Sequence, residues 1–208
     1  MKVVFFIAAC ASIVAVALIC GFMFANGVPA IGKIGFVKFI FGKVWKPGSE
    51  LFGIFPMIVG SLYVTAGAIL FGVPIGILKA VFMAFYCPKQ IYKPLKTATE
   101  LLAGIPSVVY GFFGLVVLVP LIRQLGRDLG MGGNGSSMLT AALLLGMMIL
   151  PTVIGLTESS LHAVPTQYYE GAVALGATHE RAIFRVVIPA AKSGVIAALV
   201  LGVGRAMG

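Results

Sequence analysis

The chain has 208 residues, of which 60% are hydrophobic and only 10% are charged, and its formal net charge is +9. Soluble globular domains carry about one-quarter charged residues, so this composition excludes an ordinary soluble domain and indicates a protein that folds in lipid. A strongly basic chain can also bind nucleic acid, but here the Lys and Arg residues fall between the apolar runs. That placement favours anionic lipid headgroups, so membrane lipid is an expected partner and nucleic acid is not.

Four stretches of the chain contain no Asp, Glu, Lys or Arg, and each exceeds the roughly 20 apolar residues that cross a bilayer core. The helices predicted within them cover about 3–25, 54–78, 101–122 and 138–157. A fifth apolar run begins at Ser193 and reaches Arg205 shortly before the last residue, so we expect an incomplete fifth span. The fold class predicted is all-α, a polytopic bundle with about five transmembrane helices.

The first apolar segment could be a signal peptide or a retained helix. Its apolar region is much longer than the roughly 7 to 15 residues of a signal h-region, which favours a retained helix. The loop at 26–50 alternates Lys with aromatic and aliphatic residues and carries Trp45, a pattern that fits an interfacial helix or a simple tether. We predict residues 1–50 as a first helix with its interfacial loop and residues 51–208 as the main membrane domain.

Proline and glycine interrupt the second, third and fourth predicted helices. Gly72 and Gly76 form a GxxxG pair that would let two helices approach closely, and Pro106 and Pro151 free carbonyls that need other partners. These residues suit either a gated pathway or ordinary packing and kinking. The counts of Lys and Arg on the two sides favour a cytoplasmic N-terminus only slightly.

The most informative segment is 165–194, which reads PTQYYEGAVALGATHERAIFRVVIPAAKSG. Thr166 can act as an N-cap after a proline. Tyr168, Ala172 and Leu175 then fall at i, i+4 and i+7 and share one face of a short amphipathic helix.

A turn and a second helix are expected to follow. Gly176 can end the first helix in a left-handed conformation, and Thr178 can cap a second helix with Glu180 in its first turn. This second helix runs to Pro189, directly before the fifth span. The sequence therefore predicts a helix, glycine, helix elbow within 158–192, at the membrane surface.

The elbow resembles the cytoplasmic EAA loop of ABC-importer permeases, the family of binding-protein-dependent transport system inner membrane components. Gly171 stands where that loop has its first Ala. The positions that fit its register are Glu170, Ala172, Gly176, Val186, Ile188 and Pro189. The resemblance implies a type I importer permease whose elbow docks into a groove of an ATP-binding subunit.

In that family the elbow transmits the closing of the ATPase as a rigid lever. The resemblance therefore assigns ATPase coupling to this segment of the chain. The docking candidates are Tyr168, Ala172, Leu175 and the turn at Gly176, with Glu170 orienting the helix or binding across the interface and Pro189 closing the motif. For each of these residues, plain packing of an amphipathic helix is the alternative.

A second resemblance concerns substrate. Residues 101–123, LLAGIPSVVYGFFGLVVLVPLIR, are similar to the third-helix region of phosphate-specific permeases. The ILPT at 149–152 and the final LGVGRAMG favour the C-type subunit over its A-type partner. The alternatives are a permease for another oxyanion or an amino acid, or a truncated fragment that does not transport.

Arg205 is the candidate pathway residue. An arginine inside a span is costly and faces a partner or a wet cavity, and its planar fork suits phosphate oxygens. Similar permeases read G-R-A-x-G-E here, whereas this sequence ends at Gly208, before the Glu. Family members also add a sixth helix, so the resemblance implies an incomplete permease. A helix-end arginine that reaches the headgroups is the other interpretation.

The resemblance also implies the partners and the compartment. They are a homologous A-type permease subunit, a dimer of ATP-binding subunits, and a periplasmic or lipid-anchored phosphate-binding protein, at the bacterial inner membrane. ATP is expected on the ATPase, because this chain has no GxxxxGK[ST] motif, and no cofactor is expected on this chain.

An intramembrane enzyme is the rival class. Asp128 is the only Asp, which excludes an aspartate pair, and no Glu is predicted deep within a span. His162 and His179 lack Glu or Cys at metal-ligand spacing. We therefore predict neither a catalytic residue nor a metal site.

Overall fold

The computed structural model describes residues 2–130 and 132–207, so the predicted domain ends at Met1 and Gly208 lie outside the described residues. Four helical segments in this part of the chain are long and apolar enough to cross a membrane: Lys2–Ile34, Phe55–Tyr86, Ser107–Asp128 and Met138–His162. A fifth span results if the pair His179–Ala190 and Lys192–Met207, bent by 67°, is counted as one. The predicted all-α bundle of about five spans is confirmed.

The chain forms two compact units, Met1–Val59 and Gly60–Gly208. The first holds α1 (Lys2–Ile34), α2 (Phe36–Phe41) and an antiparallel hairpin of β1 (Trp45–Lys46) and β2 (Leu51–Phe52), joined by the 3₁₀ turn η1 (Pro47–Ser49). The hairpin pairs Trp45 with Phe52 and Lys46 with Leu51. Helix α1 is longer than predicted, and α2 is the only α-helix in the rest of the loop at 26–50.

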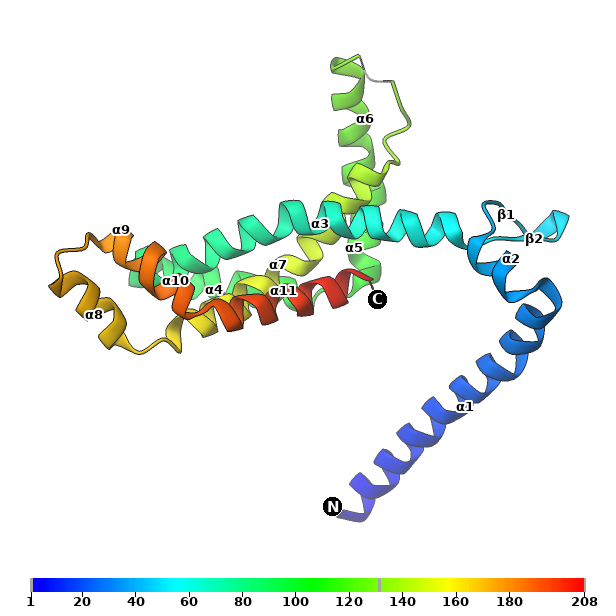
Figure 1. Cartoon of the computed structure of the whole chain (residues 1–208), viewed down its shortest axis with the longest axis horizontal. Helices are drawn as coiled ribbons and strands as arrows, with labels where there is room; N and C mark the ends of the chain where they lie inside the picture. Colours follow the sequence, from blue (N-terminus) through cyan, green and yellow to red (C-terminus); the bar gives the residue numbers. More distant parts are fainter. Residues whose placement is uncertain (1, 131, 208) are drawn as a thin grey trace. The chain divides into compact units, whose positions relative to one another are not determined.

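The boundary between the units falls within α3, after Val59. The second unit contains the rest of α3 and all the helices that follow it (Figure 1). In chain order they are α3 (Phe55–Val81), the π-helical turn η2 (Phe82–Tyr86), α4 (Lys89–Gly104), α5 (Ser107–Phe113), the π-helical turn η3 (Gly114–Leu118), α6 (Val119–Asp128), α7 (Met138–His162), α8 (Thr166–Ala174), α9 (His179–Ala182), the π-helical turn η4 (Ile183–Val187), α10 (Ile188–Ala190) and α11 (Lys192–Met207).

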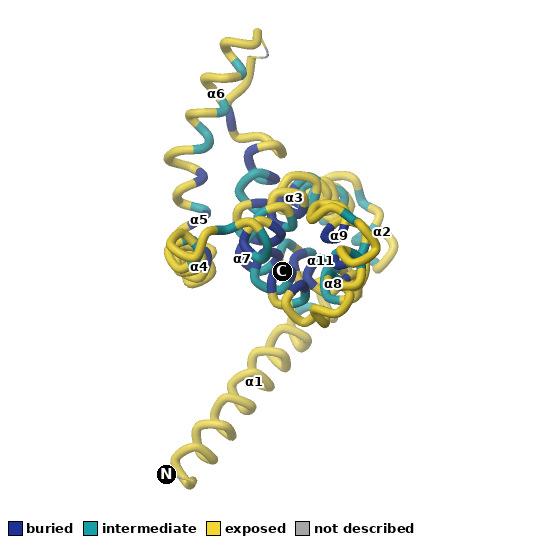
Figure 2. Tube along the Cα trace, turned by 90° about the vertical axis from the view of Figure 1, so that its left-hand side faces the viewer, coloured by how far each residue is buried: buried dark blue, intermediate teal, exposed yellow. Residues whose placement is uncertain are grey.

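Helices α3 and α7 pack closely because two glycines on α3 leave room. A Cβ added to Gly72 would lie 2.9 Å from the carbonyl oxygen of Gly146, and one on Gly76 would lie 2.8 Å from a methyl of Val153. The predicted close approach at the GxxxG pair is confirmed. Figure 2 shows the buried residues gathered where α3, α7 and α11 lie together.

Three π-helical turns occur in the described part of the chain, and each ends two residues before a proline. The turns are Phe82–Tyr86, Gly114–Leu118 and Ile183–Val187, and the prolines are Pro88, Pro120 and Pro189. Proline lacks the amide that would continue the ladder of hydrogen bonds, and its ring crowds the preceding turn. A widened turn is a common way for a helix to absorb such a disturbance.

The third span starts later than predicted. Helix α4 ends at Gly104, Ile105 is extended with φ −71° and ψ 125°, and α5 begins at Ser107. The residue before a proline avoids the helical region, so Pro106 separates an amphipathic helix from the span. The Tyr110 hydroxyl donates to the carbonyl of Leu102 across this break at 2.9 Å.

Candidate functional site

The elbow is built around a left-handed glycine. Gly176 has φ +84°, a conformation that side chains rarely adopt. The amide of Ala177 donates to the carbonyl of Ala172 at 3.0 Å, and the amide of Gly176 donates to that of Val173 at 2.9 Å. This pair of bonds is a Schellman motif, which satisfies carbonyls at the end of α8. The predicted glycine turn is confirmed.

The second helix begins as predicted. The Thr178 hydroxyl accepts a hydrogen bond from the amide of Arg181 at 3.4 Å, and Glu180 lies in the first turn. The first helix differs by one residue from the prediction. Pro165, not Thr166, occupies the N-cap position of α8, and no side chain caps it.

The two halves of the elbow differ in burial. Helix α8 has no buried residue, whereas Ala182 and Ile183 are 0% exposed and Val187 is 3% exposed. Ile183 and Val187 pack in one cluster with Leu161 of α7 and Val81 of α3. We call α8 with its glycine turn, 166–177, the free arm, and 178–191 the anchored arm.

One tyrosine joins the two arms. Tyr169 packs against the cluster around Ile183, and its hydroxyl lies 2.7 Å from Nδ1 of His179 on α9. The same imidazole makes an edge-to-face contact with Tyr86. The free arm is therefore attached through the glycine turn and through this aromatic contact.

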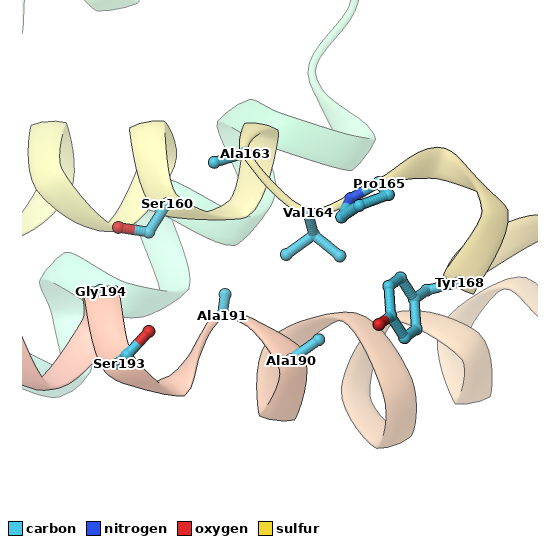
Figure 3. A pocket seen from close by; sticks show the side chains of 9 residues that line it. All are labelled: Ser160, Ala163, Val164, Pro165, Tyr168, Ala190, Ala191, Ser193 and Gly194. Carbon is cyan, nitrogen blue, oxygen red and sulfur yellow. The ribbon is translucent and has the colours of Figure 1, made fainter.

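Tyr168 lies beside a groove rather than at the tip of the elbow. Its side chain points from α8 into an open groove of about 570 Å³ between the end of α7 and the start of α11, which Ser160 and Ser193 also line (Figure 3). Helices α7 and α11 approach closely beside this groove, since a Cβ added to Gly194 would collide with the side chain of Ser160. Tyr168 is 55% exposed, so its ring remains accessible.

The other predicted coupling residues fall into two groups. Leu175 is 92% exposed at the turn, and Glu170 is exposed on α8. Ala172 is half-buried and supplies a carbonyl to the turn, and Pro189 lies in α10 of the anchored arm. Leu175 therefore presents an apolar side chain at the turn, and its docking role stays a prediction.

Arg205 lies on α11 beside α7. Its Nη1 donates to the hydroxyl of Thr152 at 3.0 Å, and the residue is exposed. In the described residues Arg205 makes no ion pair with a carboxylate. Thr152 belongs to the ILPT segment, and no local sequence pattern links it to a residue 53 positions away.

Glu158 lies near the end of the fourth span, just beyond the predicted end of that helix at 157. Helix α7 continues to His162, and Glu158 is only 5% exposed. The predicted helix stopped at the first charge, but this carboxylate is compensated inside the fold. The Tyr92 hydroxyl donates to its Oε1 at 2.5 Å, and Nε2 of His162 lies 3.9 Å from the same oxygen.

Over the described residues, no three His, Cys, Asp or Glu side chains gather in a way that could hold a metal ion. The candidate site consists of the elbow, Arg205 of α11 and the buried carboxylate of Glu158.

Comparisons with known proteins identify the family of the chain. The family of binding-protein-dependent transport system inner membrane components matches residues 72–208. The chain is 36% identical over 201 residues to the phosphate transport system permease protein PstC of Mesorhizobium japonicum, covering 89% of this chain and 61% of that relative. It is 40% identical over 174 residues to the probable ABC transporter permease protein YqgH of Bacillus subtilis, covering 83% and 55%.

A third relative is the probable PstC of Methanocaldococcus jannaschii, 35% identical over 207 residues, with 92% of this chain and 65% of that protein covered. The chain thus spans about 55 to 65% of the length of these curated relatives. A solved structure, the inward-facing MetNI methionine ABC transporter, matches with a TM-score of 0.53 at 18% identity, covering 75% of this chain and 68% of that one. This last likeness shows a shared fold.

Proposed function

This chain belongs to the family of binding-protein-dependent transport system inner membrane components, and we propose that it is the permease subunit of an ATP-driven importer of inorganic phosphate. Membership makes it an inner membrane transport component rather than an enzyme. Phosphate as substrate draws its support from relatives named as PstC.

The elbow carries the coupling part of the proposal. Its free arm presents Leu175, 92% exposed, beside a rigid glycine turn, while the anchored arm is packed into the bundle. A partner that binds the free arm would move the anchored arm with it, because the arms are joined by backbone hydrogen bonds and Tyr169. The partner proposed is an ATP-binding subunit, which would hold the ATP and act as a dimer.

Arg205 carries the pathway part of the proposal. Its guanidinium is always charged and has five donors, of which one is taken by Thr152. The remaining donors can attract an oxyanion or pair with a carboxylate supplied along the pathway. A homologous A-type permease subunit would complete that pathway, and a periplasmic or lipid-anchored binding protein would deliver phosphate to it.

Phosphate uptake tests the proposal. The chain would be expressed in cells that lack a high-affinity phosphate permease, together with the partner permease, ATPase and binding protein, both as written and extended with the C-terminal part of the Mesorhizobium japonicum relative. We expect labelled phosphate uptake at low external phosphate. We expect Arg205→Ala to reduce it by about 10-fold or more, since a charged donor to an anion is lost.

Arg127→Ala is the matched control, because Arg127 is an exposed arginine at the end of α6, outside both the elbow and the contact of Arg205. Uptake that survives Arg205→Ala would remove Arg205 from the pathway. Uptake of another oxyanion or of an amino acid in place of phosphate would support the role as a permease and reject phosphate as its substrate. An inserted, extended chain that assembles with its partners and transports none of these would refute the proposal.

A further inference from the structure

We propose that Tyr92 and Glu158 are positioning residues that carry the movement of the elbow to α4 and the third span. The inference rests on the proposed function and concerns how one chain passes motion between its own helices. Neither residue belongs to the EAA-type segment or to the pathway arginine. The link is formed by side chains 66 positions apart in the sequence.

The link begins on one face of α7. Ile154, Glu158 and Leu161 fall at i, i+4 and i+7, and all three are buried. Leu161 packs with Ile183 and Val187 of the anchored arm. The last turn of α7 therefore cannot stay still if the anchored arm shifts, because close-packed side chains transmit displacement.

The same face of α7 holds α4. The Tyr92 ring packs against Ile154 and Met83, and its hydroxyl donates to Glu158 at 2.5 Å. A buried carboxylate that loses its donor carries a large desolvation cost, so this contact favours staying closed while the helices move. Tyr92 thereby fastens α4 to the turn of α7 that the anchored arm touches.

Two further side-chain contacts hold Tyr92 and α4 in place. Nζ of Lys96 donates to the Tyr92 hydroxyl at 3.3 Å, which orients the phenol between a cation and a carboxylate. The hydrogen bond to Glu158 is the main cause that raises the pKa of Tyr92 above its usual value of 10.0, so the phenol keeps its proton and remains a donor. Nζ of Lys79 also donates to Thr99, at 2.9 Å, and ties α4 to α3.

Helix α4 leads into the third span. It ends at Gly104, and the Tyr110 hydroxyl bonds to the Leu102 carbonyl across the proline break. A displacement of α4 is therefore passed to α5 through both the chain and a side chain. The third span runs across the direction of α3 and α7 (Figure 1), so moving the end that follows α4 would change its tilt against them.

Two readouts test the link in the assembled transporter in lipid vesicles. The first is the number of substrate molecules moved per ATP hydrolysed. We expect Tyr92→Phe to lower this ratio by about 2- to 30-fold, the range that single residues on coupling networks produce, with ATPase assembly retained. Glu158→Gln keeps an amide oxygen that accepts from Tyr92, so its loss should be smaller, and the double variant should equal Tyr92→Phe alone.

The second readout is a distance. Spin labels at Lys93→Cys on α4 and Gly171→Cys on α8, with the three native cysteines replaced by alanine, should give a narrow distribution that ATP binding leaves unchanged. A second pair, Gly171→Cys with Met138→Cys at the start of α7, reports whether the elbow moves. In Tyr92→Phe the first pair should broaden or shift on ATP binding while the second still responds.

Glu100→Gln is the control, because it removes an exposed carboxylate from the same helix. An unchanged ratio and unchanged distances in Tyr92→Phe would overturn the link. So would a loss of ATPase and transport together with unchanged distances, which would mean a stabilising role only. If the second pair does not respond to ATP in the unaltered protein, the coupling elbow itself fails and the link fails with it.

Discussion

The two arms of the elbow differ more than their similar lengths suggest. The free arm, 166–177, has no buried residue in α8, whereas the anchored arm, 178–191, buries Ala182, Ile183, Val187 and Ala191. The free arm is shaped by its own backbone hydrogen bonds, and the anchored arm is shaped by α3 and α7. The free arm is held to the rest of the fold mainly by its glycine turn and Tyr169, whereas the anchored arm is packed into the bundle, and together they have the form of a lever.

Because the two arms differ in burial, variants in them can separate an effect on the stability of the fold from an effect on coupling to a partner. A change in the anchored arm removes packing from the bundle and should reduce stability. A change at the tip of the free arm removes nothing from the fold and should affect only a partner. Variants of the two arms therefore rank by their effect on stability, and that ranking can be measured.

The largest effect is expected at the base of the anchored arm. Ile183 is 0% exposed, so Ile183→Ala should lower the free energy of unfolding by about 2 to 5 kcal/mol through lost contacts and a residual cavity. The midpoint of thermal denaturation in detergent measures this. Phe184→Ala is the matched control, because the next residue is 51% exposed. Equal losses for the two variants would contradict an anchored arm.

The glycine turn should come second. Gly176→Ala places a side chain at φ +84°, which costs about 1 to 2 kcal/mol in an L-residue. Gly171→Ala is the control, since it is a helical glycine of α8 with no atom within 4 Å of an added Cβ. That change should be neutral or stabilise slightly, because alanine is the better helix former. The same denaturation midpoint distinguishes them, and a neutral Gly176→Ala would refute the strained turn.

A smaller effect is expected where the arms touch. Tyr169→Phe removes the contact between the hydroxyl and His179 but keeps the ring, so it should cost about 0.5 to 1.5 kcal/mol. Tyr168→Phe, the neighbouring change, leaves that pair intact. Faster hydrogen exchange of α8 amides in Tyr169→Phe than in Tyr168→Phe would show that the free arm has loosened. Identical exchange would mean that the glycine turn alone fixes the arm.

The local features of the elbow could be predicted because they depend on neighbouring residues. Gly176, Thr178 and Glu180 each act within a few positions, so capping rules were enough to place the turn and the start of α9. The number of spans also followed from the runs without charge, because crossing a bilayer needs a fixed apolar length. The coupling role of the elbow and the role of Arg205 remain proposals.

The contacts between distant segments could not be predicted. Glu158 meets Tyr92, and Arg205 meets Thr152, across 66 and 53 positions. In the sequence, a carboxylate within a span indicates only the free-energy cost of burying a charge. The hydrogen-bond donor that offsets this cost is seen only in the packed structure. Likewise, the break at Pro106 is visible in the sequence, but the continuation of α7 to His162 depends on partners from α4.

The smallest effect on stability, and the sharpest test of the lever, is expected at the tip. Leu175 is 92% exposed, so Leu175→Ala should change the free energy of unfolding by less than about 0.5 kcal/mol. If the tip fills a groove on the ATP-binding subunit, the same change should weaken that association by more than about 1 kcal/mol, roughly five-fold or more. Copurification of the ATPase and its affinity in detergent measure this.

Leu201→Ala makes the same chemical change at an exposed leucine of α11 and should leave the association unchanged. Weakened association by Leu175→Ala alone, with an unaltered denaturation midpoint, requires that the tip contact the partner rather than the fold. Weakening by Ile183→Ala, in contrast, should follow the loss of stability and disappear at temperatures where the variant is folded. If Leu175→Ala and Leu201→Ala behave alike, the free arm is not the docking surface, and the exposed face of the anchored arm around Phe184 becomes the candidate.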